Sequence, residues 1–276
     1  MYWVDYHVHP NTFINGRYWP HNQPLHAHLE VCRKKGIHEI GFSEHGPRYH
    51  PTYNHTSLQM DDIPAYYDTL MALQETNRDI RIRVGLELDY APEFESKWHH
   101  LKKQAPFDFL AGAVHFLPNW LPTPEGRRAY DKTGRTLEHL FIEYYQMMKS
   151  AARSQLFDFL AHPDLVKIHS ILSHLPEPDI HIELWEEFCE VCRENQQVIE
   201  FDTGWKRHEL DCYRPAPDFL EIARRYNIPI TLGSDAHKPE DIGTAYESLP
   251  EILHQAGYTH ITTFHRHHAT QHPIHD

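Results

Sequence analysis

The stretch IRIRVGLELDYAPEFESKWHHLKKQAPFDFLAGAV, residues 80–114, contains one repeating unit of the fold. Its first part, 80–88, and its last part, 107–114, are short apolar runs, and such runs predict buried strands. The segment between them, 95–105, is longer and amphipathic, which is typical of a helix that covers a sheet. A strand, a helix and a second strand in this order predict a parallel βαβ unit.

The same alternation extends along the chain on both sides of this unit. Further strands are expected at 2–6, 37–43, 157–161, 197–202, 228–234 and 260–264. Further helices are expected at 24–36, 63–77, 136–154, 182–195, 217–227 and near 239–257. These units are numerous enough to close a barrel, so we predict an α/β fold, a (β/α) barrel of seven or eight strands. We expect one domain that spans residues 1–276.

Composition excludes several classes of protein. The chain has 26 Lys and Arg against 39 Asp and Glu, a formal charge of −13, and no run rich in basic residues. Nucleic acid is therefore not expected as the main partner. The start lacks a cationic segment followed by an apolar stretch, and no run approaches the ~18 apolar residues of a membrane span. We expect a cytoplasmic protein with no membrane contact, and the sequence does not indicate its oligomeric state.

The chain contains four cysteines, too few for the disulfide framework of a small secreted domain. Cys189 and Cys192 form a CxxC pair in LWEEFCEVCREN, which could be half of a zinc site or a redox motif. The apolar residues around the pair recur at helical spacing, and the sequence has no second CxxC. We interpret both cysteines as core residues of a helix.

Potential metal ligands stand at the ends of six predicted strands. These side chains are His7, His9, Glu44, His45, Glu87, His115, His162, Asp235 and His237. In a parallel barrel the carboxyl ends of the strands meet on one face, where active sites lie. Imidazoles and carboxylates suit divalent zinc, manganese or iron, and the two histidines of HVH point to the same side of a strand.

Because the chain has 26 histidines, a histidine near a given strand end is common by chance alone. We expect lone histidines such as His38 and His99 to lie on the surface. Glu87 and Asp235, however, end otherwise apolar runs, where an unpaired carboxylate is costly to bury. A cluster of cations would offset that cost, so the joint pattern predicts a metal site.

The motifs DYHVHP, FSEHGP, GLELDY, GAVHF, AHPDLVK and GSDAH resemble those of the PHP (polymerase and histidinol phosphatase) superfamily, and more closely its histidinol-phosphatase branch. The resemblance extends from residue 3 to about residue 266. It implies a distorted (β/α)7 barrel with its metal site at the C-terminal ends of the strands. It also implies two or three divalent metal ions, zinc, manganese or iron.

The resemblance further implies a role for each ligand. His7, His9, Glu87 and Asp235 would hold one ion, and Glu87 would bridge to a second ion held also by His115 and His162. His45 and His237 would belong to a third site. There the sequence departs from the family, because Asn15 stands where a histidine is often found. Asn15 could be a weak oxygen ligand, or His21 or His26 could replace it, so two and three ions both stay open.

The segment FDTGWKRHELDCYRP resembles the part of histidinol phosphatases that contributes basic side chains to the substrate phosphate. Lys206, Arg207 and Arg214 are candidates, the first two preferred because they lie closer to the strand end, and Arg48 is a further candidate.

The activity implied is that of a metal-dependent hydrolase that converts histidinol phosphate and water to histidinol and phosphate, within histidine biosynthesis. A metal-bridging hydroxide would attack phosphorus, with Glu87, Asp235 and His237 as the catalytic set. The proton for the leaving group could come from a metal-bound water, from Asp235 or from an imidazole. The alternative is a PHP-family phosphodiesterase or phosphotriesterase that acts on another small organophosphate.

The C-terminal segment offers a rival from another class, a metal-storage protein without catalysis. From about residue 265 the chain is rich in histidine, and we expect a flexible tail that binds metal weakly and can be removed after Thr263 without loss of activity. A nuclease role is disfavoured by the charge of −13.

Overall fold

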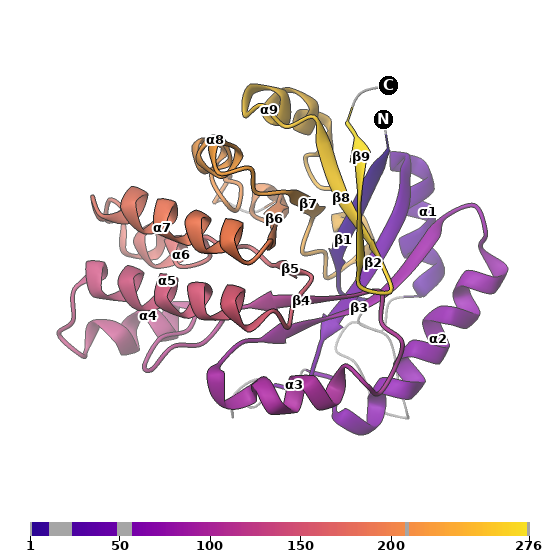
Figure 1. Ribbon diagram of the computed structural model, residues 1–276, viewed down its shortest axis with the longest axis horizontal. Helices are drawn as coiled ribbons and strands as arrows, with labels where there is room; N and C mark the ends of the chain where they lie inside the picture. The colour runs from indigo at the N-terminus through magenta and orange to yellow at the C-terminus, as the bar shows by residue number, and fades with distance from the viewer. Residues whose placement is uncertain (1, 11–23, 49–56, 208–209, 275–276) are drawn as a thin grey trace.

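The computed structural model describes residues 2–10, 24–48, 57–207 and 210–274 (Figure 1). Seven parallel strands form one sheet in chain order. The strands β1 to β7 are Trp3–Val8, Ile37–His45, Arg81–Asp89, Phe109–Ala113, Phe159–Leu160, Val198–Asp202 and Ile230–Gly233. The helices α1 to α9 are Leu25–Lys35, Ile63–Thr76, Glu95–Leu101, Pro124–Asp131, Leu137–Ser154, Lys167–Ser173, His181–Glu194, Pro217–Arg225 and Leu249–Gln255.

The first and last strands of this sheet come together. Val8 at the end of β1 pairs in parallel with Ala236, just beyond β7. The His9 amide donates to the Ala236 carbonyl at 2.8 Å, and the Ala236 amide donates to the His7 carbonyl at 3.1 Å. The sheet therefore closes into a nearly complete barrel, and the predicted (β/α)7 fold is confirmed.

A layer of aromatic rings fills the N-terminal end of the barrel. Phe264 lies 5.4 Å from Tyr6 and 5.5 Å from Phe159 between ring centroids, and Phe109 lies 5.0 Å from Tyr6. The layer needs a glycine in β3, because a Cβ on Gly85 would lie 2.4 Å from the Phe109 ring. Close packing of this kind fixes the positions of the strands relative to one another.

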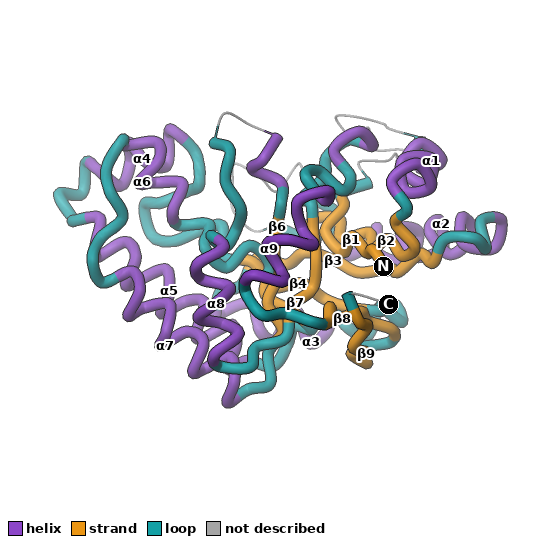
Figure 2. The backbone as a smooth tube through the Cα atoms, turned by 90° about the horizontal axis from the view of Figure 1, so that it is seen from above, coloured by secondary structure: helices purple, strands orange, loops and turns teal. Residues whose placement is uncertain are grey.

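Phe264 comes from a hairpin of β8 (His260–His265) and β9 (His268–Pro273), which pair antiparallel. In Figure 2 the hairpin lies below the strands of the barrel, while α4 and α6 lie at the upper left of the molecule. The His267 amide donates to the Asp108 carbonyl and its ring contacts the Asp158 carboxylate, both at 2.8 Å. These aspartates directly precede β4 and β5, so the hairpin covers the N-terminal end of the barrel.

The expectation of a flexible tail from about residue 265 is therefore wrong. Residues 265–273 belong to the hairpin, because backbone pairing and carboxylate contacts compensate the entropy of ordering them. Truncation after Thr263 would also remove the buried Phe264. The predicted strand at 260–264 is present, but it pairs with β9 and is not a strand of the seven-stranded sheet.

The helices agree with the sequence pattern except near the C-terminus and in two loops. Instead of one helix at 239–257, the chain forms two short 3-10 turns at Pro239–Asp241 and Tyr246–Ser248, followed by α9. The short helices α4 and α6 are not predicted, and α4 begins where the Thr123 hydroxyl accepts from the Gly126 amide. Cys189 and Cys192 are buried in α7, which confirms their interpretation as core residues.

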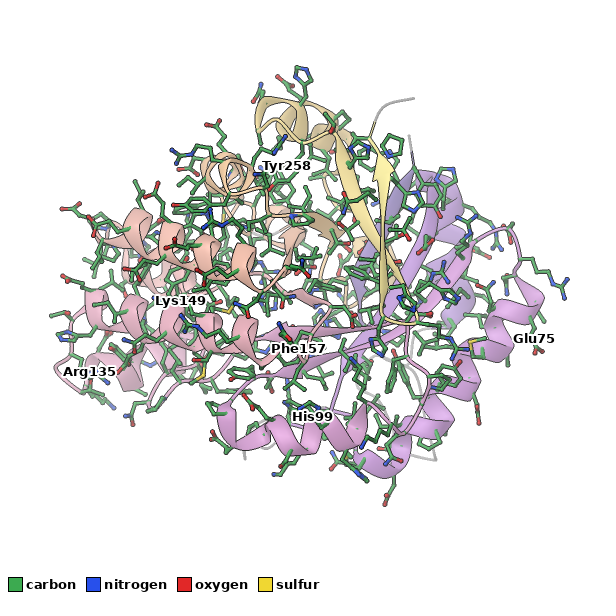
Figure 3. All side chains as sticks on the ribbon, in the orientation of Figure 1. Glu75, His99, Arg135, Lys149, Phe157 and Tyr258 are labelled. Atoms are coloured by element: carbon green, nitrogen blue, oxygen red, sulfur yellow. The ribbon has the colours of Figure 1, made fainter. Side chains whose placement is uncertain are left out.

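Surface and interior side chains separate as expected. His99, labelled in Figure 3 on α3, is exposed, as is His38, whereas Phe157, also labelled there, is buried. Of the helices in the described ranges, none has both the length and the apolar character needed to cross a membrane.

Candidate active site

The predicted metal ligands come together at the C-terminal end of the barrel. They are carried by the ends of β1, β2 and β3 and by the loops that follow β1, β4, β5 and β7. The set comprises His7, His9, His45, Glu87, His115, His162, Asp235 and His237, and each of these residues lies within 4 Å of at least one other member of the set. Parallel strands bring these ends together although the residues are far apart in the sequence.

Glu87 occupies the centre of the group. Its Oε1 lies 2.9 Å from His162 Nε2, 3.4 Å from His115 Nε2 and 3.5 Å from His7 Nε2. Its Oε2 lies 2.7 Å from His45 Nδ1. One carboxylate therefore faces imidazoles from four other elements, which is the arrangement that a bridging ligand requires.

Asp235 forms a second carboxylate centre beside β1. Its Oδ1 lies 3.3 Å from His9 Nε2, 3.7 Å from His7 Nε2 and 3.5 Å from His237 Nδ1. The residue has a φ of 47°, a left-handed backbone that is uncommon outside glycine and is often found at functional sites.

Three clusters in this region have donor atoms close enough to share one ion. They are His7 with His9 and Asp235, His7 with Glu87 and His162, and His9 with His45 and His237. The third cluster is the site where the sequence departs from its family. Of the residues considered to complete it, Asn15 and His21 lie outside the described residues, and His26 is exposed on α1 and belongs to none of the clusters.

Carboxylates and imidazoles shift one another's pKa values at the centre of the group. Burial opposes ionisation of Glu87, but the rings of His115, His7 and His45 outweigh it and hold the pKa of this carboxyl well below its usual range. Burial lowers the pKa of His162 to about 4, so this imidazole is neutral near neutral pH. Although burial opposes it, the carboxylates of Glu200, Glu87 and Asp235 raise the pKa of His7 well above its usual value. Divalent metals bind ionised carboxylates and neutral imidazoles, so His7 would lose its proton when an ion binds.

The spacing of the donor atoms also fits. Two atoms that each lie about 2.1 Å from one tetrahedral ion are roughly 3.4 Å apart, close to the 3.3–3.7 Å measured among His7, His9, Glu87 and Asp235. Within the described chain, the buried His7 Nε2 atom has no hydrogen-bond partner. Buried polar atoms are normally paired, so this atom fits the role of a metal ligand.

Sequence reasoning missed the carboxylates behind the ligand imidazoles. Glu200 on β6 lies 2.8 Å from His7 Nδ1, and Asp89 at the end of β3 lies 2.5 Å from His115 Nδ1. Such partners orient metal-ligating histidines. The signal was present for Asp89, because residues two apart on a strand share a face and Asp89 follows Glu87 at that spacing.

A pocket of about 240 Å³ opens over the cluster. Two arginines, Arg48 and Arg214, lie in its wall beside an apolar surface that includes Leu165, Ile168 and Trp205. The Arg214 guanidinium stacks on the Trp205 ring, 4.6 Å from its centroid, and its Nη2 donates to Asp235 at 2.8 Å. The pocket therefore places cationic and apolar walls next to the candidate metal ligands.

The other two basic candidates are engaged elsewhere. The Arg207 guanidinium donates to the backbone carbonyls of Ser234 and Asp235, both at 2.5 Å, and so holds the loop after β7. Lys206 pairs with Asp211 at 2.5 Å on the surface. Neither residue lines the pocket, so the geometry favours Arg214 and Arg48 over the sequence-based preference for Lys206 and Arg207.

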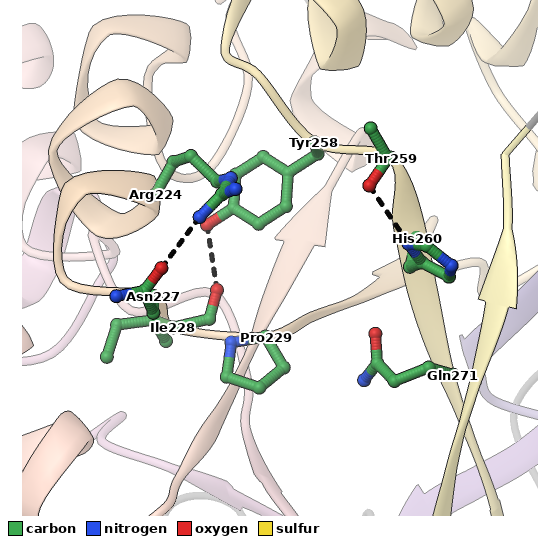
Figure 4. A pocket seen from close by; sticks show the side chains of 8 residues that line it. All are labelled: Arg224, Asn227, Ile228, Pro229, Tyr258, Thr259, His260 and Gln271. Atoms are coloured by element: carbon green, nitrogen blue, oxygen red, sulfur yellow. Dashed lines mark hydrogen bonds between the residues drawn. The ribbon is translucent and has the colours of Figure 1, made fainter.

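A second hollow of about 240 Å³ lies between α8 and the β8–β9 hairpin (Figure 4). Its polar groups bond to one another or to nearby backbone. Arg224 donates to the Asn227 side chain at 2.8 Å and to the Gly257 carbonyl at 2.9 Å, and the Tyr258 hydroxyl donates to the Ile228 carbonyl at 2.9 Å. We assign it no ligand.

Comparison with known proteins agrees with this geometry. The chain matches the family described as "PHP domain" over residues 5–204 and the one described as "PHP-associated" over residues 219–254. It is 30% identical over 242 residues to a Deinococcus radiodurans protein named "Probable histidinol-phosphatase", covering 87% of this chain and 90% of the relative. It is 27% identical over 268 residues to the Bacillus subtilis "Histidinol-phosphatase", covering 90% and 98% of the two chains.

A solved structure with the same fold is the Lactococcus lactis histidinol phosphate phosphatase complexed with zinc, L-histidinol and phosphate. It superposes with a TM-score of 0.74 at 19% identity and covers 97% of this chain and 98% of its own. The matched motifs, the barrel and the ligand cluster at its C-terminal end agree, and the chain belongs to the PHP domain family.

Proposed function

We propose that this chain is a metal-dependent phosphatase that hydrolyses histidinol phosphate to histidinol and phosphate. The observation that carries the proposal is the convergence of buried imidazoles on Glu87 directly below a pocket walled by Arg48 and Arg214. The relatives that match most of this chain carry the name of this activity. Histidine biosynthesis in the cytoplasm is the context we propose for it.

We assign the metal ligands as the sequence predicts them. His7, His9, Glu87 and Asp235 would hold one ion, and Glu87 with His115 and His162 would hold a second. His45 and His237 would belong to a third site, where His9 also lies close enough to contribute. A neutral imidazole has one free lone pair, so His9 would serve either the first ion or the third. Divalent ions bound there would lower the pKa of coordinated water and neutralise charge on phosphate oxygens.

The surrounding residues would bind and orient the ester. Arg214 is 3% exposed, fixed by Asp202, Asp235 and the Trp205 ring, and it lies at the pocket wall. A guanidinium held in this way loses little entropy when it grips phosphate oxygens. Arg48 lines the same pocket, with its Nε 3.2 Å from Asp89, so two cationic groups are available to the phosphate.

The apolar side of the pocket would receive the organic part of the substrate. Leu165, Ile168 and Trp205 present a small surface that suits a flat ring such as imidazole. Its volume of about 240 Å³ is smaller than that of a typical drug-sized site. A compact monoester therefore fits better than a large diester.

The test is the steady-state kcat/KM of protein of known metal content on histidinol phosphate, beside a phosphodiester and a phosphotriester, with zinc and manganese each supplied. We expect a preference of at least tenfold for histidinol phosphate. Weak activity on it with faster turnover of a diester or triester would replace this proposal by the alternative, a PHP-family phosphodiesterase or phosphotriesterase.

A further inference from the structure

Glu200 is a buried carboxylate outside the predicted ligand set and outside the pocket wall. It lies in β6 with no exposed surface, one layer below the candidate metal ligands. Its Oε1 accepts from His7 Nδ1 at 2.8 Å, and its Oε2 accepts from the His162 backbone amide at 2.8 Å. One side chain therefore joins a ligand at the end of β1 to a ligand that follows β5.

The surrounding backbone makes room for this carboxylate. A Cβ on Gly233 in β7 would lie 1.8 Å from Glu200 Oε1 and 2.6 Å from the His7 Cβ. A side chain at position 233 would therefore displace the contact between Glu200 and His7. Glycine at this position is explained by the close approach of these two groups.

His162 has an unusual backbone that Glu200 supports. Its φ is 28°, in the left-handed region, which costs free energy for a residue with a side chain. The hydrogen bond from its amide to Glu200 helps to hold that conformation, in which Nε2 of the ring lies 2.9 Å from Glu87. The same carboxylate thus acts on the ring of one ligand and on the backbone of another.

We propose that Glu200 is a positioning residue that couples the two ions sharing Glu87. By accepting from Nδ1 it fixes the tautomer of His7 in which Nε2 is free to bind metal, and by accepting from the His162 amide it aims the second imidazole. The inference rests on the proposed function only in that the site holds metal; it does not depend on the substrate.

Glu200 is not placed to be a ligand itself. Together with His7 and Asp202 it forms a fourth group close enough for an ion. Asp202, however, accepts from the Arg214 guanidinium at 2.5 Å and from the Gly204 amide, and both oxygens of Glu200 already accept hydrogen bonds. A fixed guanidinium at this position disfavours a second cation beside it.

The first experiment measures zinc affinity and the number of ions bound per chain in Glu200→Gln, by competition with a chromophoric chelator. Glutamine retains the shape of the glutamate side chain, but its NH₂ group is a donor and would face either His7 Nδ1 or the His162 amide. One of the two hydrogen bonds that Glu200 accepts is therefore lost. Replacement of such a partner typically weakens metal binding roughly 10- to 100-fold. Coupling predicts that both ions sharing Glu87 bind more weakly, not one alone.

Glu39→Gln is the matched control. Glu39 is also a buried barrel carboxylate with several partners, among them Tyr2 and Arg83 at 2.8 and 2.9 Å, but it lies near the N-terminal end of β2. We expect its zinc affinity to equal that of the wild type.

A crystal structure of the zinc-loaded wild type tests the proposal without any variant. It should show zinc bound to His7 Nε2 and a Glu200 oxygen that accepts a hydrogen bond from His7 Nδ1. A Glu200 oxygen within about 2.2 Å of an ion, or zinc affinity unchanged in Glu200→Gln, would overturn the proposal. Inactivity of the wild type toward histidinol phosphate would contradict the proposed function but leave these zinc measurements, and this inference, intact.

Discussion

Replacing Phe264 by alanine tests whether the β8–β9 hairpin is a structural part of the barrel. The side chain is 2% exposed, and its ring contacts those of Tyr6, Phe109 and Phe159. Truncating a buried phenylalanine to alanine costs about 3–5 kcal/mol, from lost burial and from the cavity left behind. We expect the free energy of unfolding of Phe264→Ala to fall by that amount.

The substitution isolates the ring from the backbone contacts of the same residue. The Phe264 amide and carbonyl both bond to the Tyr6 hydroxyl, at 2.7 and 3.1 Å, and alanine can keep both bonds. For a large domain each kcal/mol lowers Tm by roughly 2–4 °C, so the expected decrease is roughly 6–20 °C. Urea titration followed by circular dichroism measures the free energy, and a thermal scan measures Tm.

His268→Ala is the control, since His268 is an exposed residue of β9 in the same hairpin. Its unfolding free energy should stay within about 0.5 kcal/mol of the wild type. Zinc content per folded chain should be unchanged in both variants, because the aromatic layer lies at the opposite end of the barrel from Glu87. A loss below about 1 kcal/mol in Phe264→Ala would refute the assignment of the hairpin to the core.

Three further predictions concern the site and its surroundings. Glu87→Gln should lose bound zinc, measured by metal analysis, and also phosphatase activity, measured by phosphate release. A fully metallated, active variant would contradict the bridging role of Glu87. Arg214→Lys should lower kcat/KM by roughly 10- to 100-fold, which corresponds to the loss of one charged hydrogen bond. Lys206→Ala is the control and should change kcat/KM less than twofold. Equal effects of the two substitutions would contradict the placement of Arg214 in the phosphate site. Although burial opposes it, hydrogen bonds to two carboxylates raise the pKa of His181 from 6.5 to about 9. The protonated ring therefore stabilises the fold fully below pH 6.5, and this contribution is lost as the pH rises past 9. The loss is on the order of 3 kcal/mol, and urea titrations across this range should show that slope in the wild type and not in His181→Gln.

The fold and the clustering of the candidate ligands could be predicted because both depend on local patterns. Apolar runs alternate with amphipathic segments, and a parallel barrel gathers strand ends on one face whatever the details of packing. His7, Glu87 and Asp235 follow directly from that rule. The C-terminal hairpin could not be predicted from composition, because its histidines suggest solvent, while their contacts with Asp108 and Asp158 exist only once the barrel has formed.

Glu200 was missed, and Arg214, although a candidate, was ranked below Lys206 and Arg207, for a related reason. Glu200 and Arg214 act through partners on other strands, and strand spacing does not show which partner a buried side chain will meet. Arg207 is nearer in sequence to the strand end than Arg214, yet its guanidinium is used by backbone carbonyls after β7. Proximity in sequence was therefore a poor guide to which basic side chain reaches the pocket.

The central claim is that ions held around Glu87 carry out the hydrolysis. The most direct measurement is phosphate release from histidinol phosphate by protein stripped of metal and then reloaded stepwise with zinc, with the ions bound per chain determined at each step. The account predicts no activity without metal and a rise in kcat that follows occupancy of the two sites that share Glu87. Activity that persists in the stripped protein, or that does not change with bound zinc, would contradict it.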